Sequence, residues 1–184
     1  MLKASVAFLA LFLLGQSAAP QRPRILGLAH IAGYVSDLQR ARGFYQGLLG
    51  FDEPFTLPRA DGSVDIAFVK INDRQWIELL NQPSAGEGQL HHIALHTDSA
   101  DRMRDYLASR GVAVPATVGN GRTGDKSFMV TDPDGHRVEI VEYQPDSLTR
   151  AETGRHMPAS RLSGHAMHAG ILVGFGLGPL AGQV

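Results

Sequence analysis

The chain has 184 residues, 43% of them hydrophobic and 19% charged, which is enough for one globular domain with a substantial core. Its formal net charge at pH 7 is -1 and its isoelectric point is near 6.7. This balance offers no basic surface to nucleic acid or anionic lipid, so nucleic-acid binding is disfavoured. The sequence contains no cysteine, which excludes disulfides and thiolate metal ligands.

Residues 1–19 have the pattern of a secretory signal peptide. Lys3 precedes an apolar run from Ala4 to Gly15, and small residues follow through Ala19. A run of about a dozen apolar residues is short for a membrane span, which favours a cleaved signal over a permanent anchor. We therefore expect an exported protein, periplasmic or extracellular, with no stable membrane association after cleavage. Residues 20–26 are expected to form a polar linker.

Residues 27–82 predict a module of strand, helix and three further strands. Asp37 is a predicted helix N-cap, and Gly50 is expected to end the helix. Between them, apolar residues recur at helical spacing and are expected in the core, Phe44 and Tyr45 among them. The following strands are expected at Phe51–Leu57, Val64–Ile71 and Gln75–Leu80.

Residues 90–145 repeat this order. A strand at His91–Thr97 precedes a helix with the apolar stripe Met103, Tyr106 and Leu107, which Gly111 ends. Three more strands are expected at Val112–Val118, Lys126–Thr131 and His136–Tyr143. The sequence therefore predicts a duplicated module and an α+β fold, with helices covering one face of the strands and a cavity on the other.

Both modules carry a histidine and a glutamate at nearly the same spacing. Glu78 follows His30 by 48 positions, and Glu139 follows His92 by 47. Side chains alternate along a strand, and in all four strands these residues fall on the face away from the aliphatic pairs. Two imidazoles and two carboxylates that converge there would suit a divalent metal ion, namely Zn, Ni, Co, Mn or Fe(II).

Three other histidines are less clear. His91 has the wrong parity and is expected at the surface or facing a helix, whereas His96 has the parity of the cup and could support a ligand. His136 lies beside the predicted DPDG turn and is expected to be solvated.

Several cavity residues can also be proposed. Trp76 and Tyr34 share the predicted ligand face, where they form either an aromatic wall or core packing. Arg122 and Lys126 flank a glycine-containing loop that could close over an anionic substrate, although solvated loop charges are the better interpretation.

Three segments carry a resemblance to a known family: HIAGYVSDLQRARGFYQGLLGF (30–51), HHIALHTDSADRMRDYLASRGV (91–112) and DPDGHRVEIVEY (132–143). Residues 27–145 resemble the vicinal oxygen chelate superfamily, which includes glyoxalase I, methylmalonyl-CoA epimerase, extradiol dioxygenases and the bleomycin resistance proteins. The resemblance implies two βαβββ modules that form an eight-stranded cup around a metal ion. It also implies that His30, Glu78, His92 and Glu139 are the metal ligands, a set similar to that of bacterial glyoxalase I.

The implied activity is that of a lyase or isomerase acting on a small oxygen-chelating substrate. Glu139 or Glu78 would act as the base that removes a proton next to a carbonyl. Two alternatives remain open, an extradiol-type Fe(II) dioxygenase and a non-catalytic module that binds a small molecule. A homodimer is also possible.

The C-terminal tail, residues 146–184, differs from the rest of the chain. Its segment RLSGHAMHAGILVG (161–174) resembles the opening strand RILGLAHIAGYV (24–35), with His168 near the place of His30. We expect an apolar strand at Ala166–Val173 that represents the start of a truncated further module. The alternative is a natural docking tail used for dimerisation.

Overall fold

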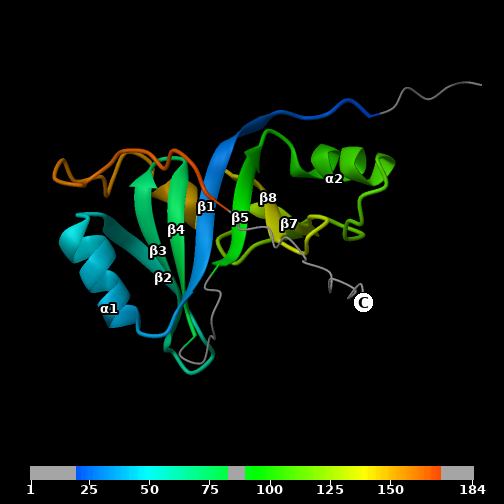
Figure 1. Cartoon of the computed structure of the whole chain (residues 1–184). Coiled ribbons are helices and arrows are strands. Elements are labelled where there is room, and N and C mark those ends of the chain that lie inside the picture. Colours follow the sequence, from blue (N-terminus) through cyan, green and yellow to red (C-terminus); the bar gives the residue numbers. More distant parts are fainter. Residues whose placement is uncertain (1–19, 83–89, 171–184) are drawn as a thin grey trace, which may run out of the picture.

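The computed structural model describes residues 20–82 and 90–170, which form one curled sheet of eight strands with helices on its outer side (Figure 1). The predicted signal peptide lies outside the described residues. In the part of the chain that is described, no helix is long and apolar enough to cross a membrane.

The first module has the predicted order of elements: β1 (Ile25–Val35), α1 (Leu38–Arg42), β2 (Asp52–Pro58), β3 (Val64–Asn72) and β4 (Gln75–Asn81). The carboxylate of Asp37 accepts hydrogen bonds from two backbone N–H groups of the first helical turn, at 2.9 and 3.0 Å, as expected of an N-cap. The helix continues as a π-helical segment, η1 (Gly43–Leu48), and ends before Gly50, whose φ of +73° suits glycine. Because β1 begins at Ile25, the predicted linker is two residues shorter than expected.

The second module contains β5 (Leu90–Thr97), α2 (Ala100–Ser109), β6 (Gly119–Asn120), β7 (Lys126–Thr131) and β8 (Arg137–Glu142). The strand predicted at Val112–Val118 is wrong, because only the two residues of β6 pair with β7. Pro115 lies in the middle of that segment and has no N–H to donate to a neighbouring strand. Val114 and Val118 instead pack against the core beneath α2, which explains the apolar alternation.

The two modules join at the centre of the sheet. The strand order is β2-β3-β4-β1-β5-β8-β7-β6, with β1 and β5 antiparallel at the junction. On either side of this junction, β4 is parallel to β1 and β8 is parallel to β5, so the halves are equivalent. The predicted α+β class and the eight-stranded cup are confirmed.

Two apolar clusters lie between the sheet and its helices. Beneath α1 and η1, the outward-facing Ala67, Val69 and Leu79 are at most 1% exposed. Beneath α2, Met103 packs with residues of β7 and β8, as the predicted stripe requires. Tyr45 packs against the first cluster, but the prediction for Phe44 is wrong, since its side chain is 48% exposed. The two residues are adjacent in η1, so their side chains point in different directions, and only that of Tyr45 reaches the cluster.

Residues beyond β8 fold back over the first module (Figure 1). A short helix, α3 (Leu148–Ala151), is followed by a segment without regular structure that reaches residue 170. Buried Lys70 donates to the backbone carbonyls of Glu152 and Arg155, and Gln75 exchanges hydrogen bonds of 3.1 Å with the backbone of Ala166. Residues 166–170 form no strand, and the rest of the predicted strand, residues 171–173, lies outside the described residues. The hypothesis that the tail is a truncated module therefore stays a prediction.

Candidate metal centre

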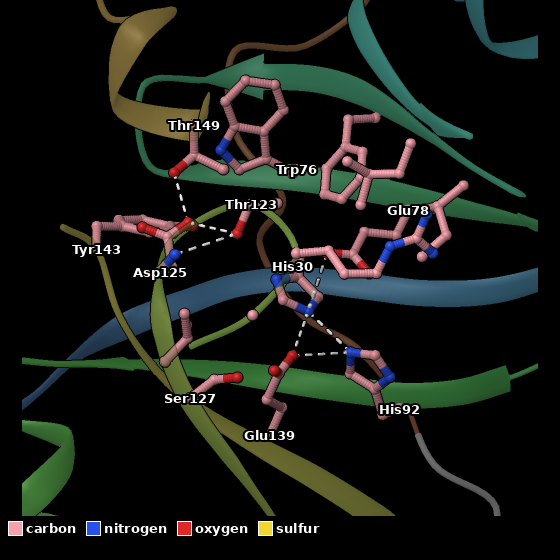
Figure 2. A pocket seen from close by; sticks show the side chains of 16 residues that line it. His30, Trp76, Glu78, His92, Thr123, Asp125, Ser127, Glu139, Tyr143 and Thr149 are labelled. Carbon is pink, nitrogen blue, oxygen red and sulfur yellow. Dashed lines mark hydrogen bonds and ion pairs between the residues drawn. The ribbon is translucent and has the colours of Figure 1, made fainter. Parts of the chain in front are cut away.

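The four predicted ligands come from the four central strands and meet on the inner face of the sheet (Figure 2). His30 lies on β1, Glu78 on β4, His92 on β5 and Glu139 on β8. Both histidines are 6% exposed, and Glu78 is 9% exposed. All four belong to one chain, so the group does not need a second copy to assemble.

Two fully buried alanines leave room for this group. Ala32 on β1 is paired with both Glu78 and His92, and Ala94 on β5 is paired with both His30 and Glu139. A larger side chain at either alanine would occupy the space between the two central strands. The strand register therefore places Ala32 between Glu78 and His92, and Ala94 between His30 and Glu139.

His30, His92 and Glu139 form a compact group of donors. The Nε2 atoms of the two histidines are 2.8 Å apart, and they lie 2.9 and 3.1 Å from Oε2 of Glu139. Three atoms at these separations fit on a sphere with a radius of about 2.1 Å, the bond length of zinc and similar ions to imidazole and carboxylate. The group could therefore hold a divalent metal ion.

Glu78 is not part of that compact group, although it lies beside it. Its Oε1 is 3.4 Å from Nε2 of His30. Burial, together with repulsion from Glu139, raises the pKa of the Glu78 carboxyl. Burial would also raise the pKa of Glu139, but hydrogen bonds from His30 and His92 outweigh it and hold that pKa well below its ordinary value. The two carboxylates thus occupy different environments, a distinction that the sequence does not make.

The imidazole of His30 also differs from a free histidine. Burial alone would lower its pKa, but the carboxylates of Glu78 and Glu139 more than compensate, so the pKa of His30 is raised. A metal ion at this nitrogen would compete with a proton.

His91 lies behind His92, whereas its parity predicted the surface or a helix. Its Nδ1 is 2.6 Å from Nδ1 of His92, and its Nε2 is 2.5 Å from a guanidinium nitrogen of Arg137. The ring of Tyr34 contacts it edge-on, with the centroids 5.1 Å apart. Tyr34 therefore packs on His91 and is not one of the residues that line the cavity.

A cavity of about 160 Å³ adjoins the four side chains. One wall is apolar and comes from the first module. It includes Trp76, for which the sequence left a cavity wall and core packing open, and Phe68, which stacks on Phe55 with the centroids 4.5 Å apart. The indole nitrogen of Trp76 is buried and has no hydrogen-bond partner among the described residues. The other residues of this wall are Leu57 and Ile66.

The opposite wall is polar and was not predicted. Asp125, which is 3% exposed, accepts hydrogen bonds from Thr123 at 3.0 Å, Thr149 at 2.7 Å and the backbone N–H of Gln144 at 2.9 Å. Figure 2 shows this cluster at the end of the cavity away from His92. Thr149 belongs to α3, so the C-terminal tail contributes to the cavity. These residues lie in loops and at a helix start, where sequence periodicity carries no signal.

The remaining candidates have other partners. Lys126 pairs with Asp101 at 2.7 Å on the surface, whereas Arg122 lines the cavity and pairs with Asp65. His96 contacts the ring of Tyr143 with a centroid separation of 4.5 Å, and it is not one of the clustered donors. His136, predicted to be solvated, is half-buried and lies 2.9 Å from the carboxylate of Asp132.

Comparisons with known proteins identify the family of the chain. Residues 27–140 match the family model of the Glyoxalase/Bleomycin resistance protein/Dioxygenase superfamily. A lactoylglutathione lyase of Salmonella typhimurium strain LT2 is 30% identical over 123 residues, which cover 62% of this chain and 91% of that protein.

Two solved structures share the fold. Methylmalonyl-CoA epimerase from Mycobacterium tuberculosis has a TM-score of 0.58 and 22% identity, over 66% of this chain and 90% of the epimerase. The 2,3-dioxygenase LapB from Pseudomonas sp. KL28 has a TM-score of 0.56 and 20% identity, over 65% of this chain and 43% of LapB.

Proposed function

Because the chain belongs to the Glyoxalase/Bleomycin resistance protein/Dioxygenase superfamily, we propose that it is a metal-dependent lyase or isomerase that moves a proton next to a carbonyl group. The observation that carries this proposal is the place of Glu78. Its carboxylate lines the cavity beside three clustered donors without being one of them. It is therefore free to act on a substrate held at the metal centre.

The two carboxylates would divide the chemistry between them. His30, His92 and Glu139 would hold a divalent ion, which supplies a Lewis acid for adjacent oxygens of the substrate. Glu139 remains ionised because its pKa is lowered, as a ligand must. Burial raises the pKa of the Glu78 carboxyl, which suits a group that takes a carbon-bound proton and returns it to a neighbouring atom. The apolar wall around Trp76 excludes water during the transfer.

The cavity limits the size of the substrate. Its volume of about 160 Å³ is close to that of an apolar cavity that holds benzene, about 150 Å³. It is smaller than the roughly 300–1,000 Å³ of sites for drug-sized ligands. The reacting part of the substrate is therefore compact, and any larger substituent extends through the mouth beside Arg122.

Glu78→Gln tests the proposal. Wild-type protein loaded with Zn²⁺ or Ni²⁺ is incubated in D₂O with small α-hydroxyketones such as hydroxyacetone, and carbon-bound hydrogen exchange is followed by NMR. We expect Glu78→Gln to keep its metal and to lose about 10²-fold or more in exchange rate. Glu139→Gln should lose metal as well. Undiminished exchange in Glu78→Gln would refute the assignment of the base.

One observation favours a second candidate, an extradiol-type dioxygenase. Two imidazoles and one carboxylate are the ligand set of many non-haem Fe(II) oxygenases. Oxygen consumption by Fe(II)-loaded protein with catechol tests it. Turnover of catechol without hydroxyketone exchange would favour this candidate, and neither activity would favour a binding module.

Location and assembly remain separate proposals. Export rests on the sequence of residues 1–19 alone. A homodimer stays a prediction, which sizing of the purified protein would test.

A further inference from the structure

The polar end of the cavity, formed by Thr123, Asp125 and Thr149, holds a carboxylate without a paired cation. Asp125 is 3% exposed, and it accepts hydrogen bonds from the two threonine hydroxyls and from one backbone N–H. No lysine is among the described residues that line the cavity, and the arginine there, Arg122, pairs with Asp65. A carboxylate offers about four acceptor positions, so one position of Asp125 is left for a ligand.

The same end holds a donor that the described residues leave unpaired. The side chain of Trp76 is 1% exposed, and its indole nitrogen is buried without a hydrogen-bond partner among these residues. Figure 2 shows this nitrogen pointing toward Thr149, whose hydroxyl donates to Asp125. A buried N–H without an acceptor costs about 1–3 kcal/mol, so a ligand that supplies an acceptor here gains affinity.

A hydroxyl group satisfies both partners. It has one proton, which Asp125 can accept, and an oxygen that can accept the N–H of Trp76. An ammonium group donates but cannot accept, and a carbonyl group accepts but cannot donate. A carboxylate on the ligand would be repelled by Asp125. The polar end is therefore complementary to an alcohol.

Resting on the metal-bound substrate of the proposed function, we propose that the substrate carries a further hydroxyl group, which binds between Asp125 and the indole N–H of Trp76. The substrate class is then a short, uncharged hydroxyketone with a second hydroxyl at the end remote from the metal. Because the indole nitrogen is covered, binding requires a small shift of the side chains around it.

Part of this end lies outside the region that the family shares. Thr149 holds Asp125 at 2.7 Å, and it follows residues 27–140, which match the family model. The preference for a second hydroxyl is therefore a property of this chain and need not extend to its relatives.

Two pairs of ketones that differ by one terminal hydroxyl test the inference. Dihydroxyacetone is compared with hydroxyacetone, and ethyl hydroxymethyl ketone is compared with the same ketone bearing a hydroxyl at the end of its ethyl group. Calorimetric titration of the zinc-loaded Glu78→Gln variant measures affinity without turnover. We expect about tenfold tighter binding of the hydroxylated ketone in at least one pair, because its partner leaves the indole N–H unpaired. Equal affinities within both pairs would overturn the inference.

Fluorescence of Trp76, the single tryptophan of the chain, observes the contact directly. A hydrogen bond from the indole N–H shifts the emission to longer wavelength. Wild-type protein should show this shift with the hydroxylated ketone that binds more tightly, and not with its partner. This measurement needs neither turnover nor a variant, and the absence of a shift at saturation would overturn the inference.

Substitutions in the Glu78→Gln background assign the preference to the two residues. Trp76→Phe keeps an aromatic ring without the N–H, and Asp125→Asn exchanges an acceptor oxygen for a donor. Each should reduce the tenfold preference to about twofold or less. Thr97→Val is the control, because it removes a buried hydroxyl that lies outside the cavity and donates to a backbone oxygen at 2.9 Å. A preference that persists in both variants, or that Thr97→Val also abolishes, would overturn the inference.

The outcomes separate this inference from the proposed function. Carbon-bound hydrogen exchange by the wild-type protein without a preference within either pair would overturn the inference and leave the proposed function standing. A preference and an emission shift without hydrogen exchange would support the hydroxyl site and refute the proposed function.

Discussion

Lys70→Met should destabilise the protein by detaching the C-terminal segment from the sheet. The ammonium group of Lys70 is fully buried on β3, where it pairs with Asp73 at 2.7 Å. It also donates to the backbone carbonyls of Glu152 and Arg155. Methionine fills a similar volume but provides no donor. The carbonyl of Arg155 would lose its donor, whereas that of Glu152 would keep the backbone N–H of Arg155 at 3.1 Å.

The magnitude follows from these three contacts. The carbonyl of Arg155, left without a donor, costs about 1–3 kcal/mol if it stays buried, and the carbonyl of Glu152 loses one of two hydrogen bonds, worth about 0.5–1.5 kcal/mol. Asp73 is 36% exposed in its side chain, so its carboxylate regains water and adds little. Removal of a buried ammonium also relieves its desolvation, which offsets part of the loss. We therefore expect a decrease of about 2–3 kcal/mol in the free energy of unfolding.

Urea unfolding measures this change through the fluorescence of Trp76, the single tryptophan of the chain. At an m value of about 2 kcal/mol/M, the midpoint should fall by roughly 1 M. Lys126→Met is the matched control, because Lys126 forms an exposed pair with Asp101, and its loss should cost less than about 1 kcal/mol. If Lys70→Met lowers stability no more than this control does, the C-terminal segment is not held by Lys70.

Three further outcomes are expected. Metal affinity should fall as the pH is lowered from 8 to 6, because the pKa of His30 is raised from its ordinary value and a protonated imidazole cannot bind a metal ion. Zinc competition at several pH values checks this, and an affinity that does not change with pH would contradict it. His92→Ala should abolish stoichiometric metal in elemental analysis whereas His96→Ala retains it, and equal metal contents would argue against His92 as a ligand. Gly50→Ala should lower the free energy of unfolding by about 1–3 kcal/mol more than Gly62→Ala does. Both glycines have positive φ, but a Cβ at Gly50 would lie 3.0 Å from a backbone oxygen of the C-terminal segment, whereas one at Gly62 would meet open space. Equal losses of stability would show that the close contact is unimportant.

The positions of His30 and His92 could be predicted because strand geometry is periodic. Alternation of side chains along β1 and β5 assigns both histidines to the inner face, and the repeat of the module implies that they meet. The same alternation places Trp76 in the wall of the cavity. Parity alone could not predict the contact between His91 and His92, because neighbouring side chains on opposite faces can still touch at the edge of a strand.

Contacts from loops and from the tail could not be predicted in this way. Asp125 and Thr149 meet across 24 positions through a hydrogen bond between a loop and α3, and neither segment has a regular period. The false strand at Val112–Val118 arose because valines that pack beneath a helix can alternate as they do in a strand. Pro115 already argued against a strand in this segment, because proline has no N–H to donate to a neighbouring strand.

The segment that ends the described chain ties the two halves of the sheet to each other. Through Thr149 it is bonded to Asp125 in the second half, and through Glu152 it is bonded to Lys70 in the first. Two copies could form a domain-swapped dimer, in which each chain exchanges one half of its sheet, only if this segment first lost its contacts with both halves. Any dimer that forms from folded protein should therefore be a side-by-side pair in which each chain keeps both of its own halves.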